Sequence, residues 1–159
     1  VSNQQIFNGL AYVQVTQNRT QWLKANNGAD ILSDVYNANP TAMGLVLDTF
    51  AKLPSEGRRL AVLADMLALG ADSYSLHASM VDHINDQDFQ EIYLYGDEMK
   101  GLKLALADRY PSLTVRYFNK SDKSQMIQAI KESLQTTDSI VLKGSNGMGL
   151  FEVVEALQQ

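Results

Sequence analysis

The sequence predicts an α/β fold in which a doubly wound, mainly parallel sheet of the Rossmann-like type carries an antiparallel hairpin at its amino-terminal side. Five short apolar segments alternate with segments of helical periodicity, and strands joined by helices pair in parallel through right-handed crossovers. An Asn-Gly pair ahead of the first apolar segment is typical of a hairpin turn. These two observations carry the prediction.

The hairpin is expected between Arg19 and Asp34. Side chains alternate up to Lys24, Asn26-Asn27-Gly28 supplies the turn, and an apolar run forms the second strand. Trp22 is expected to pack against the core.

Upstream of the hairpin, residues 3–11 have the spacing of a short amphipathic helix. The length of 159 residues favours one domain that carries a fragment of another. We expect the boundary between them within residues 16–29.

After Pro40 the pattern becomes regular. Proline stops a strand and suits the first turn of a helix, so we expect a helix to begin near Thr41. The expected helices cover residues 41–53, 73–86, 97–109 and 121–135, with a last one from about 149, and the parallel strands cover 29–34, 60–63, 92–95, 114–118 and 139–142.

Composition excludes several classes of protein. Thirteen basic against eighteen acidic residues give a net charge of −5, which argues against a nucleic-acid surface. The absence of cysteine excludes disulfides and thiolate metal sites. No apolar run reaches the roughly 18 residues of a membrane span, and the amino terminus lacks a signal-peptide pattern. We expect a cytoplasmic protein.

Polar residues gather where the predicted strands end, which is where this fold class binds ligands. The first strand ends in Asp34-Val35-Tyr36-Asn37-Ala38-Asn39, the second in Asp65, and the last in Lys143 with the Gly-rich loop 144–149. Carboxylates and a lysine at neighbouring strand ends can converge on an anion or a metal.

Each of these residues also has a structural interpretation. Asp34, Asn37 and Asn39 can cap a helix or a turn, Asp65 can cap the turn after its own strand, and the glycines after Lys143 can serve close packing. The lysine loop matches neither the P-loop nor the G-x-G-x-x-G pattern.

The two histidines, His77 and His83, lack acidic partners at the spacing of a metal site. We interpret them as helix surface residues or, for His77, as a hydrogen-bonding core residue, and we expect no metal ligands in this chain.

Three strings together resemble the signatures of the MurF branch of the Mur ligase family. They are Tyr36-Asn37-Ala38-Asn39-Pro40 after Asp34, the run from Val62 to Gly70 with His77 downstream, and the run from Lys143 to Leu150. The resemblance covers residues 29–159, as the carboxy-terminal domain of such a ligase, and residues 1–28 resemble the tail of its central ATPase domain with a connecting hairpin.

The resemblance implies an ATP- and Mg²⁺-dependent amide ligase that activates a UDP-N-acetylmuramoyl-tripeptide as an acyl phosphate and adds D-Ala-D-Ala. The P-loop is absent from this sequence, so the chain alone is expected to be inactive, and we expect a monomer. The implied ATP-binding residues are Arg19, Asp34, Asn37 and Asn39, the dipeptide-binding residues are Lys143 and Ser145, and Tyr36, Asp65 and His77 are supporting residues.

The sequence departs from the family pattern at Ala64, Ala68 and Asn146, where the family has Gly, Glu and Arg, and at Asn18, where a glycine often precedes the arginine. Two alternatives stay open. One is a receiver-like regulatory module with Asp97 as the phosphate acceptor, and the other is a free-standing nucleotide-binding protein.

Overall fold

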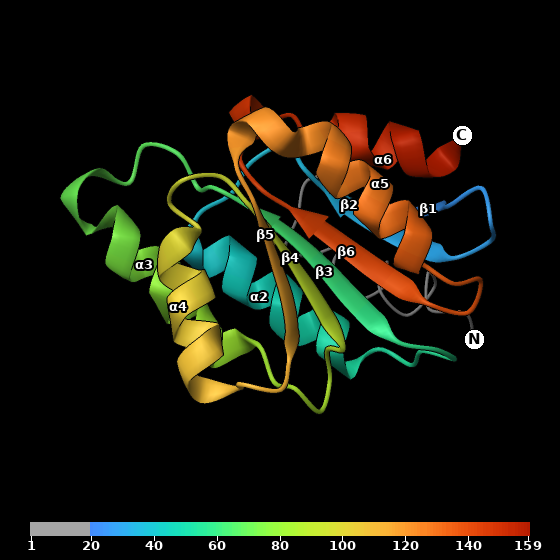
Figure 1. Cartoon of the computed structure of the whole chain (residues 1–159), viewed down its shortest axis with the longest axis horizontal. Coiled ribbons are helices and arrows are strands. Elements are labelled where there is room, and N and C mark those ends of the chain that lie inside the picture. Colours follow the sequence, from blue (N-terminus) through green and yellow to red (C-terminus); the bar gives the residue numbers. More distant parts are fainter. Residues whose placement is uncertain (1–19) are drawn as a thin grey trace.

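A six-stranded sheet forms the centre of the chain in a computed structural model that describes residues 20–159 (Figure 1). The strand order is β1-β2-β6-β3-β4-β5, and every neighbouring pair is parallel except β1 with β2. This arrangement confirms the predicted fold class. The strands are β1 (Gln21–Lys24), β2 (Asp30–Asp34), β3 (Arg59–Ala64), β4 (Glu91–Tyr95), β5 (Thr114–Phe118) and β6 (Ser139–Lys143).

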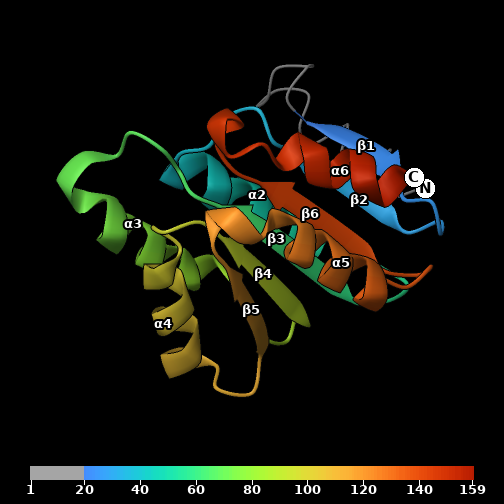
Figure 2. The same cartoon turned by 45° about the horizontal axis from the view of Figure 1, so that its top comes forward.

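Helices cover both faces of the sheet. Helix α2 lies on one face together with α3 and α4, whereas α5 and α6 lie side by side on the other (Figures 1 and 2). The bounds are α2 (Pro40–Lys52), α3 (Ser73–Ser79), α4 (Lys100–Arg109), α5 (Lys123–Ser133) and α6 (Leu150–Gln158), with 3-10 turns η1 (Gly70–Asp72), η2 (Met80–His83), η3 (Lys120–Asp122) and η4 (Asn146–Met148). None of the helices between residues 20 and 159 is long and apolar enough to cross a membrane.

The predicted hairpin is confirmed. Gln21 pairs with Ser33 and Lys24 with Asp30 in an antiparallel register, and Gly28 turns the chain at a φ of 98°. Trp22 is buried, with its ring 6.5 Å from that of Phe50. The helix expected over residues 3–11 lies outside the described part of the chain.

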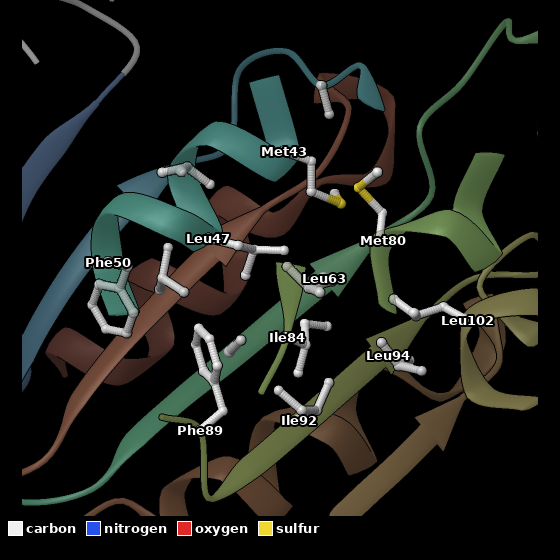
Figure 3. Close-up of a cluster of buried hydrophobic side chains, with 14 of the residues drawn as sticks. Met43, Leu47, Phe50, Leu63, Met80, Ile84, Phe89, Ile92, Leu94 and Leu102 are labelled. Carbon is white, nitrogen blue, oxygen red and sulfur yellow. The ribbon is translucent and has the colours of Figure 1, made fainter. Parts of the chain in front are cut away.

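Successive residues of the central strands contribute to opposite faces of the sheet, so both faces hold a core. In β3, Ala61 and Leu63 pack toward α2 and α4, whereas Leu60 and Val62 pack toward α5 and α6. Figure 3 shows the first core, where α2 places a row of side chains over the sheet. That row consists of Met43, Leu47 and Phe50.

Helix α2 begins where proline chemistry predicts. The Asn39 side chain accepts the Ala42 N–H at 2.8 Å as an N-cap, and Pro40 occupies the first helical position, where it has no hydrogen bond to lose.

The expectation of one helix over residues 73–86 is wrong. Helix α3 ends at Ser79, η2 continues to His83, and Ile84 is extended. Asn85 then organises a turn, since its side chain accepts the Gln87 N–H and its carbonyl accepts the N–H groups of two following residues. Helices α4 and α5 also begin two to three residues later than expected, because 3-10 or turn residues precede them.

The amino ends of the strands are joined by a network of polar side chains, called here the amino-edge network. Its centre is Arg58, which donates to Glu91 at 2.6 Å and to Asp138 at 2.7 Å. Glu91 also accepts the Tyr93 hydroxyl at 2.6 Å and the Ser133 hydroxyl at 2.7 Å. Asp138 is 1% exposed, so the guanidinium compensates a fully buried carboxylate.

Candidate functional site

The loops that follow β2, β3 and β6 meet at the carboxyl edge of the sheet. Strand β6 lies between the other two, and its last residue, Lys143, is in register with Asp34 of β2 and Leu63 of β3. The ends of β2, β6 and β3, which the sequence analysis identified by their polar residues, are therefore adjacent. Ligands of this fold class bind at such strand ends.

The loop after β2 presents polar side chains to solvent. Tyr36 is 56% exposed, and Asn37 and Asn39 are also exposed. Asn37 accepts the Ala38 N–H at 2.9 Å, and Asn39 caps α2. The capping interpretation is thus confirmed for Asn39, whose side chain is also exposed.

Lys143 and Asp34 form a buried ion pair at 3.1 Å, with their side chains only 4% and 6% exposed. The same ammonium group donates to the carbonyl oxygen of Asn37. Lysine is costly to bury unless its charge is compensated, and here a carboxylate and a carbonyl do so. The β6 end is thereby tied to the loop after β2.

Asp65 connects the ends of three strands. Its N–H donates to the Tyr95 carbonyl, its carbonyl accepts the Ser145 N–H, and its carboxylate accepts the Met99 N–H at 3.1 Å. Gly96, at a φ of 117°, lies so close that a Cβ there would overlap the carboxylate. Asp65 therefore caps the turn before α4 instead of the turn after its own strand.

The Asp65 carboxylate is almost fully buried. Burial raises its pKa, and the N–H groups of Glu98 and Met99 oppose that rise only in part. A buried acid with a raised pKa at a strand end is a marker of functional sites.

Two side chains hold the loop after β3. His77 is fully buried; its Nε2 accepts the Met66 N–H at 2.9 Å, and its Nδ1 lies 2.7 Å from the Ser73 carbonyl, to which it donates. The Ser145 hydroxyl accepts the next amide, the Leu67 N–H, also at 2.9 Å. Within residues 20–159, Ala68 is the one non-glycine residue with a positive φ, at 63°.

The structure thus brings Asp34, Asn37 and Lys143 together on one side of β6, and Asp65, His77 and Ser145 on the other. The core interpretation of His77 is confirmed. Arg19 lies outside the described residues. His83 is a partly exposed partner of Asp48 at 2.9 Å.

Sequence reasoning missed the backbone groups that these side chains hold, namely the Asn37 carbonyl and the Leu67 N–H. Lys143 and Asn37 are 106 residues apart and Ser145 and Leu67 are 78 apart, so no local pattern announces either contact. In the described part of the chain, no three His, Asp or Glu side chains are grouped as metal ligands.

Three of the four departures from the family pattern, Ala64, Ala68 and Asn146, lie at the end of β3 or in the loops after β3 and β6, and Asn18 lies outside the described residues. A Cβ at Gly144 would come within 2.7 Å of the Ala64 Cβ, so the alanine already fills the space that a side chain at 144 would need. Ala68 occupies the left-handed position, and Asn146 is exposed at the start of η4.

Comparison with known proteins gives consistent matches. A family model described as "Mur ligase, glutamate ligase domain" matches residues 18–146. The UDP-N-acetylmuramoyl-tripeptide–D-alanyl-D-alanine ligase of Bacillus subtilis is 30% identical over 149 residues, and that of Escherichia coli is 28% identical over 153. These alignments cover 94% and 95% of this chain but 32% of each relative, so the chain spans about a third of the length of the curated relatives it matches.

Solved structures agree on the fold. The MurF ligase of Thermotoga maritima in complex with ADP superposes with a TM-score of 0.71 at 18% identity, covering 94% of this chain and 32% of that one. MurF from Acinetobacter baumannii gives 0.72 at 19% identity, covering 99% and 34%. At such identities the likeness concerns the fold alone.

Proposed function

Because the chain belongs to the Mur ligase family, whose glutamate ligase domain model matches most of its length, we propose that it is the carboxy-terminal domain of an ATP-dependent ligase. The reaction that we propose adds D-alanyl-D-alanine to a UDP-N-acetylmuramoyl-tripeptide in peptidoglycan precursor synthesis, in the cytoplasm. The observation that carries the proposal is the 30% identity, over 94% of this chain, to a ligase of that name.

We propose that residues 29–159 form this domain, and that residues 1–28 are the tail of a preceding ATPase domain with the connecting hairpin. A P-loop is absent from the sequence, so ATP and Mg²⁺ would be held mainly by a domain outside this chain, and the 159 residues alone are inactive. ATP, when bound, supplies the phosphoryl group that activates the tripeptide carboxylate as an acyl phosphate.

The loop after β2 fits a contribution to nucleotide binding. Tyr36 and Asn37 expose a phenol and an amide, which can stack on and hydrogen-bond to a nucleoside. Asp34 is held beneath them by Lys143, so it would set the loop's position and charge. The assignment of Arg19, Asp34 and Asn39 to ATP, and of Lys143 and Ser145 to the dipeptide, stays a prediction.

The proposal is tested by kinetics of the full-length protein that the gene encodes. Release of phosphate should require ATP, the UDP-linked tripeptide and D-Ala-D-Ala together. Asn37→Ala should raise the KM for ATP about fivefold to tenfold, the effect of one lost hydrogen bond, with little change in the KM for the dipeptide.

Asn26→Ala is the matched control, because this exposed asparagine lies in the hairpin turn at the other edge of the sheet. Phosphate release that responds to another amine and not to D-Ala-D-Ala would refute the proposed substrate. An unchanged KM for ATP in Asn37→Ala would refute the proposed nucleotide contact.

A further inference from the structure

We infer that the Asn146-Gly147 pair in the loop after β6 is a site of spontaneous deamidation, which converts the asparagine to aspartate and isoaspartate. Glycine after asparagine favours this reaction, because no Cβ obstructs the approach of the glycine nitrogen to the asparagine side chain. Asn-Gly occurs three times in the sequence, at residues 8–9, 27–28 and 146–147. The first pair lies outside the described residues, and the other two can be compared.

The chemistry needs only the chain and water, so it does not depend on the proposed function. Base removes the proton of the Gly147 amide, and the nitrogen attacks the side-chain carbonyl carbon, Cγ, of Asn146. A bond between this nitrogen and Cγ forms and closes a succinimide ring, while the bond between Cγ and Nδ2 breaks and the amide nitrogen takes up a proton and leaves as ammonia. Water then adds to either ring carbonyl, and ring opening gives aspartate or isoaspartate.

The backbone at Asn146 leaves the reacting groups accessible. Asn146 and Gly147 are both exposed and lie at the start of the 3-10 turn η4. The Met148 N–H donates to the Ser145 carbonyl at 2.9 Å, and the Gly149 N–H donates to the Asn146 carbonyl at 3.0 Å. Within residues 20–159, neither the Gly147 N–H nor the Asn146 side chain takes part in a hydrogen bond, as is usual for the first amides of a helical turn.

The Asn27-Gly28 pair in the hairpin turn is also exposed, but hydrogen bonds hold its reacting groups. Nδ2 of Asn27 donates to the Leu134 carbonyl at 2.9 Å, and Oδ1 accepts the Ala29 N–H at 3.0 Å. The Gly28 N–H, whose nitrogen would have to attack, donates to the Ala25 carbonyl at 2.9 Å. Both the asparagine side chain and the glycine amide are therefore engaged.

The fold should therefore make the two pairs react at different rates. At Asn27, three hydrogen bonds must break before the nitrogen can reach Cγ, whereas at Asn146 the bond accepted by its own carbonyl is the one that opposes the rotation. Two further hydrogen bonds slow the reaction at Asn27 about thirtyfold relative to Asn146.

Either product alters the carboxyl edge of the sheet. Aspartate adds a negative charge next to Ser145, whose hydroxyl accepts the Leu67 N–H. Isoaspartate also inserts one carbon into the main chain between residues 146 and 147. Gly147 packs so closely on Leu67 that a Cβ there would lie 2.9 Å from the leucine side chain, so the longer main chain cannot keep both η4 and this contact unchanged.

The test is peptide mapping by mass spectrometry of the full-length protein that the gene encodes, sampled during incubation in warm, mildly alkaline buffer. In the folded protein, isoaspartate should accumulate at residue 146 about thirtyfold faster than at residue 27. In the protein unfolded in urea, the two sites should react at similar rates, because the hydrogen bonds that separate them are lost.

Asn146→Gln is the matched control. It keeps an exposed side-chain amide at the same place, but closure would need a larger ring, so residue 146 of this variant should stay unmodified while residue 27 keeps its wild-type rate.

An Asn146 that stays intact in the folded protein but reacts in urea would overturn the inference, as would an Asn27 that reacts equally fast in the folded protein. Equal rate ratios in the folded and the unfolded protein would assign the difference to neighbouring residues and would also overturn it. Aspartate without isoaspartate at residue 146 would refute the succinimide route, since opening of that ring yields both.

Discussion

The amino and carboxyl edges of the sheet both contain buried charged groups, but the partners of these groups and their effects on pKa differ between the two edges. At the amino edge, Arg58 bridges two carboxylates and lowers the pKa of Asp138 against the opposing effect of burial. The pKa of Glu91 is lowered, also against burial, by hydrogen bonds from the Tyr93 and Ser133 hydroxyls and by Arg58. At the carboxyl edge, no arginine between residues 20 and 159 pairs with Asp65, and burial raises its pKa.

The backbone conformation also differs between the two edges. In the described part of the chain, the one non-glycine residue in a left-handed conformation, Ala68, lies at the carboxyl edge. A shifted pKa alone does not distinguish the carboxyl edge from the amino edge. Within the amino-edge network, burial together with Glu91 raises the pKa of Tyr93 to about 12. The carboxyl edge differs because it combines a buried acid with a raised pKa, Asp65, and a loop that holds Ala68 in a left-handed conformation. Both features are typical of functional sites.

Removing Arg58 is expected to have the largest effect on stability. Arg58→Met leaves Asp138 buried without its cation, so the free energy of unfolding should fall by about 3 kcal/mol at pH 7. Urea denaturation measures the loss. Arg116→Met, on the exposed side of the edge strand β5, is the control and should change stability by less than about 0.5 kcal/mol.

The sign of the pH dependence follows from the lowered pKa values. A carboxyl with a lowered pKa in the folded state stabilises the protein above its unfolded pKa, and this contribution disappears as pH falls through the folded pKa. The deficit of Arg58→Met should therefore shrink below about pH 4. A deficit that is independent of pH would show that packing of the arginine stem dominates.

Asp65 tests the carboxyl edge with a smaller effect. Asp65→Ala leaves the Met99 N–H without its acceptor, so the free energy of unfolding should fall by about 1 to 2 kcal/mol. Asp65→Asn keeps an acceptor for that N–H and removes the buried charge, so it should be more stable than Asp65→Ala. Thermal unfolding of both variants against wild type measures the difference.

For Asp65 the pH dependence has the opposite sign. A raised pKa in the folded state means that the ionised carboxyl costs stability at neutral pH, and that this cost disappears as pH falls toward the unfolded value of 3.8. Asp65→Asn should therefore lose stability relative to wild type as the solution is acidified from pH 7. A constant difference between the two would remove this contrast between the edges.

Parts of the fold that neighbouring residues encode could be predicted from the sequence. The strand over residues 114–118, the hairpin turn and the start of α2 are encoded by neighbouring residues, such as Asn39 beside Pro40, and their prediction is confirmed. The predicted parallel direction of the strands made it possible to expect Asp34, Asp65 and Lys143 at one edge. The direction in which each side chain points depends on partners distant in sequence, so the Asn37 carbonyl as the partner of Lys143 was not foreseeable.

The amino-edge network was missed for a similar reason. Arg58 and Asp138 directly precede the neighbouring strands β3 and β6, and this position is the one sequence signal that they meet. Only the carboxyl ends of the strands were considered as sites for polar residues, so this signal was missed. The helix expected over residues 73–86 was wrong because the hydrogen bonds of Asn85 compete with a further helical turn.

A substitution at Ala68 tests the contrast between the edges with the smallest expected effect, because it changes mainly the conformational preference of the backbone. Ala68→Gly should raise the free energy of unfolding by about 0.5 kcal/mol, since glycine adopts the φ of 63° without the steric cost that alanine has, although its unfolded chain is freer. Ala105→Gly in α4 is the control and should lower stability by about 1 kcal/mol, the ordinary helix penalty. Chemical denaturation of the two variants should therefore give shifts of opposite sign. If Ala68→Gly were also destabilising, the loop after β3 would hold no appreciable strain, and the carboxyl edge would be as relaxed as the amino edge.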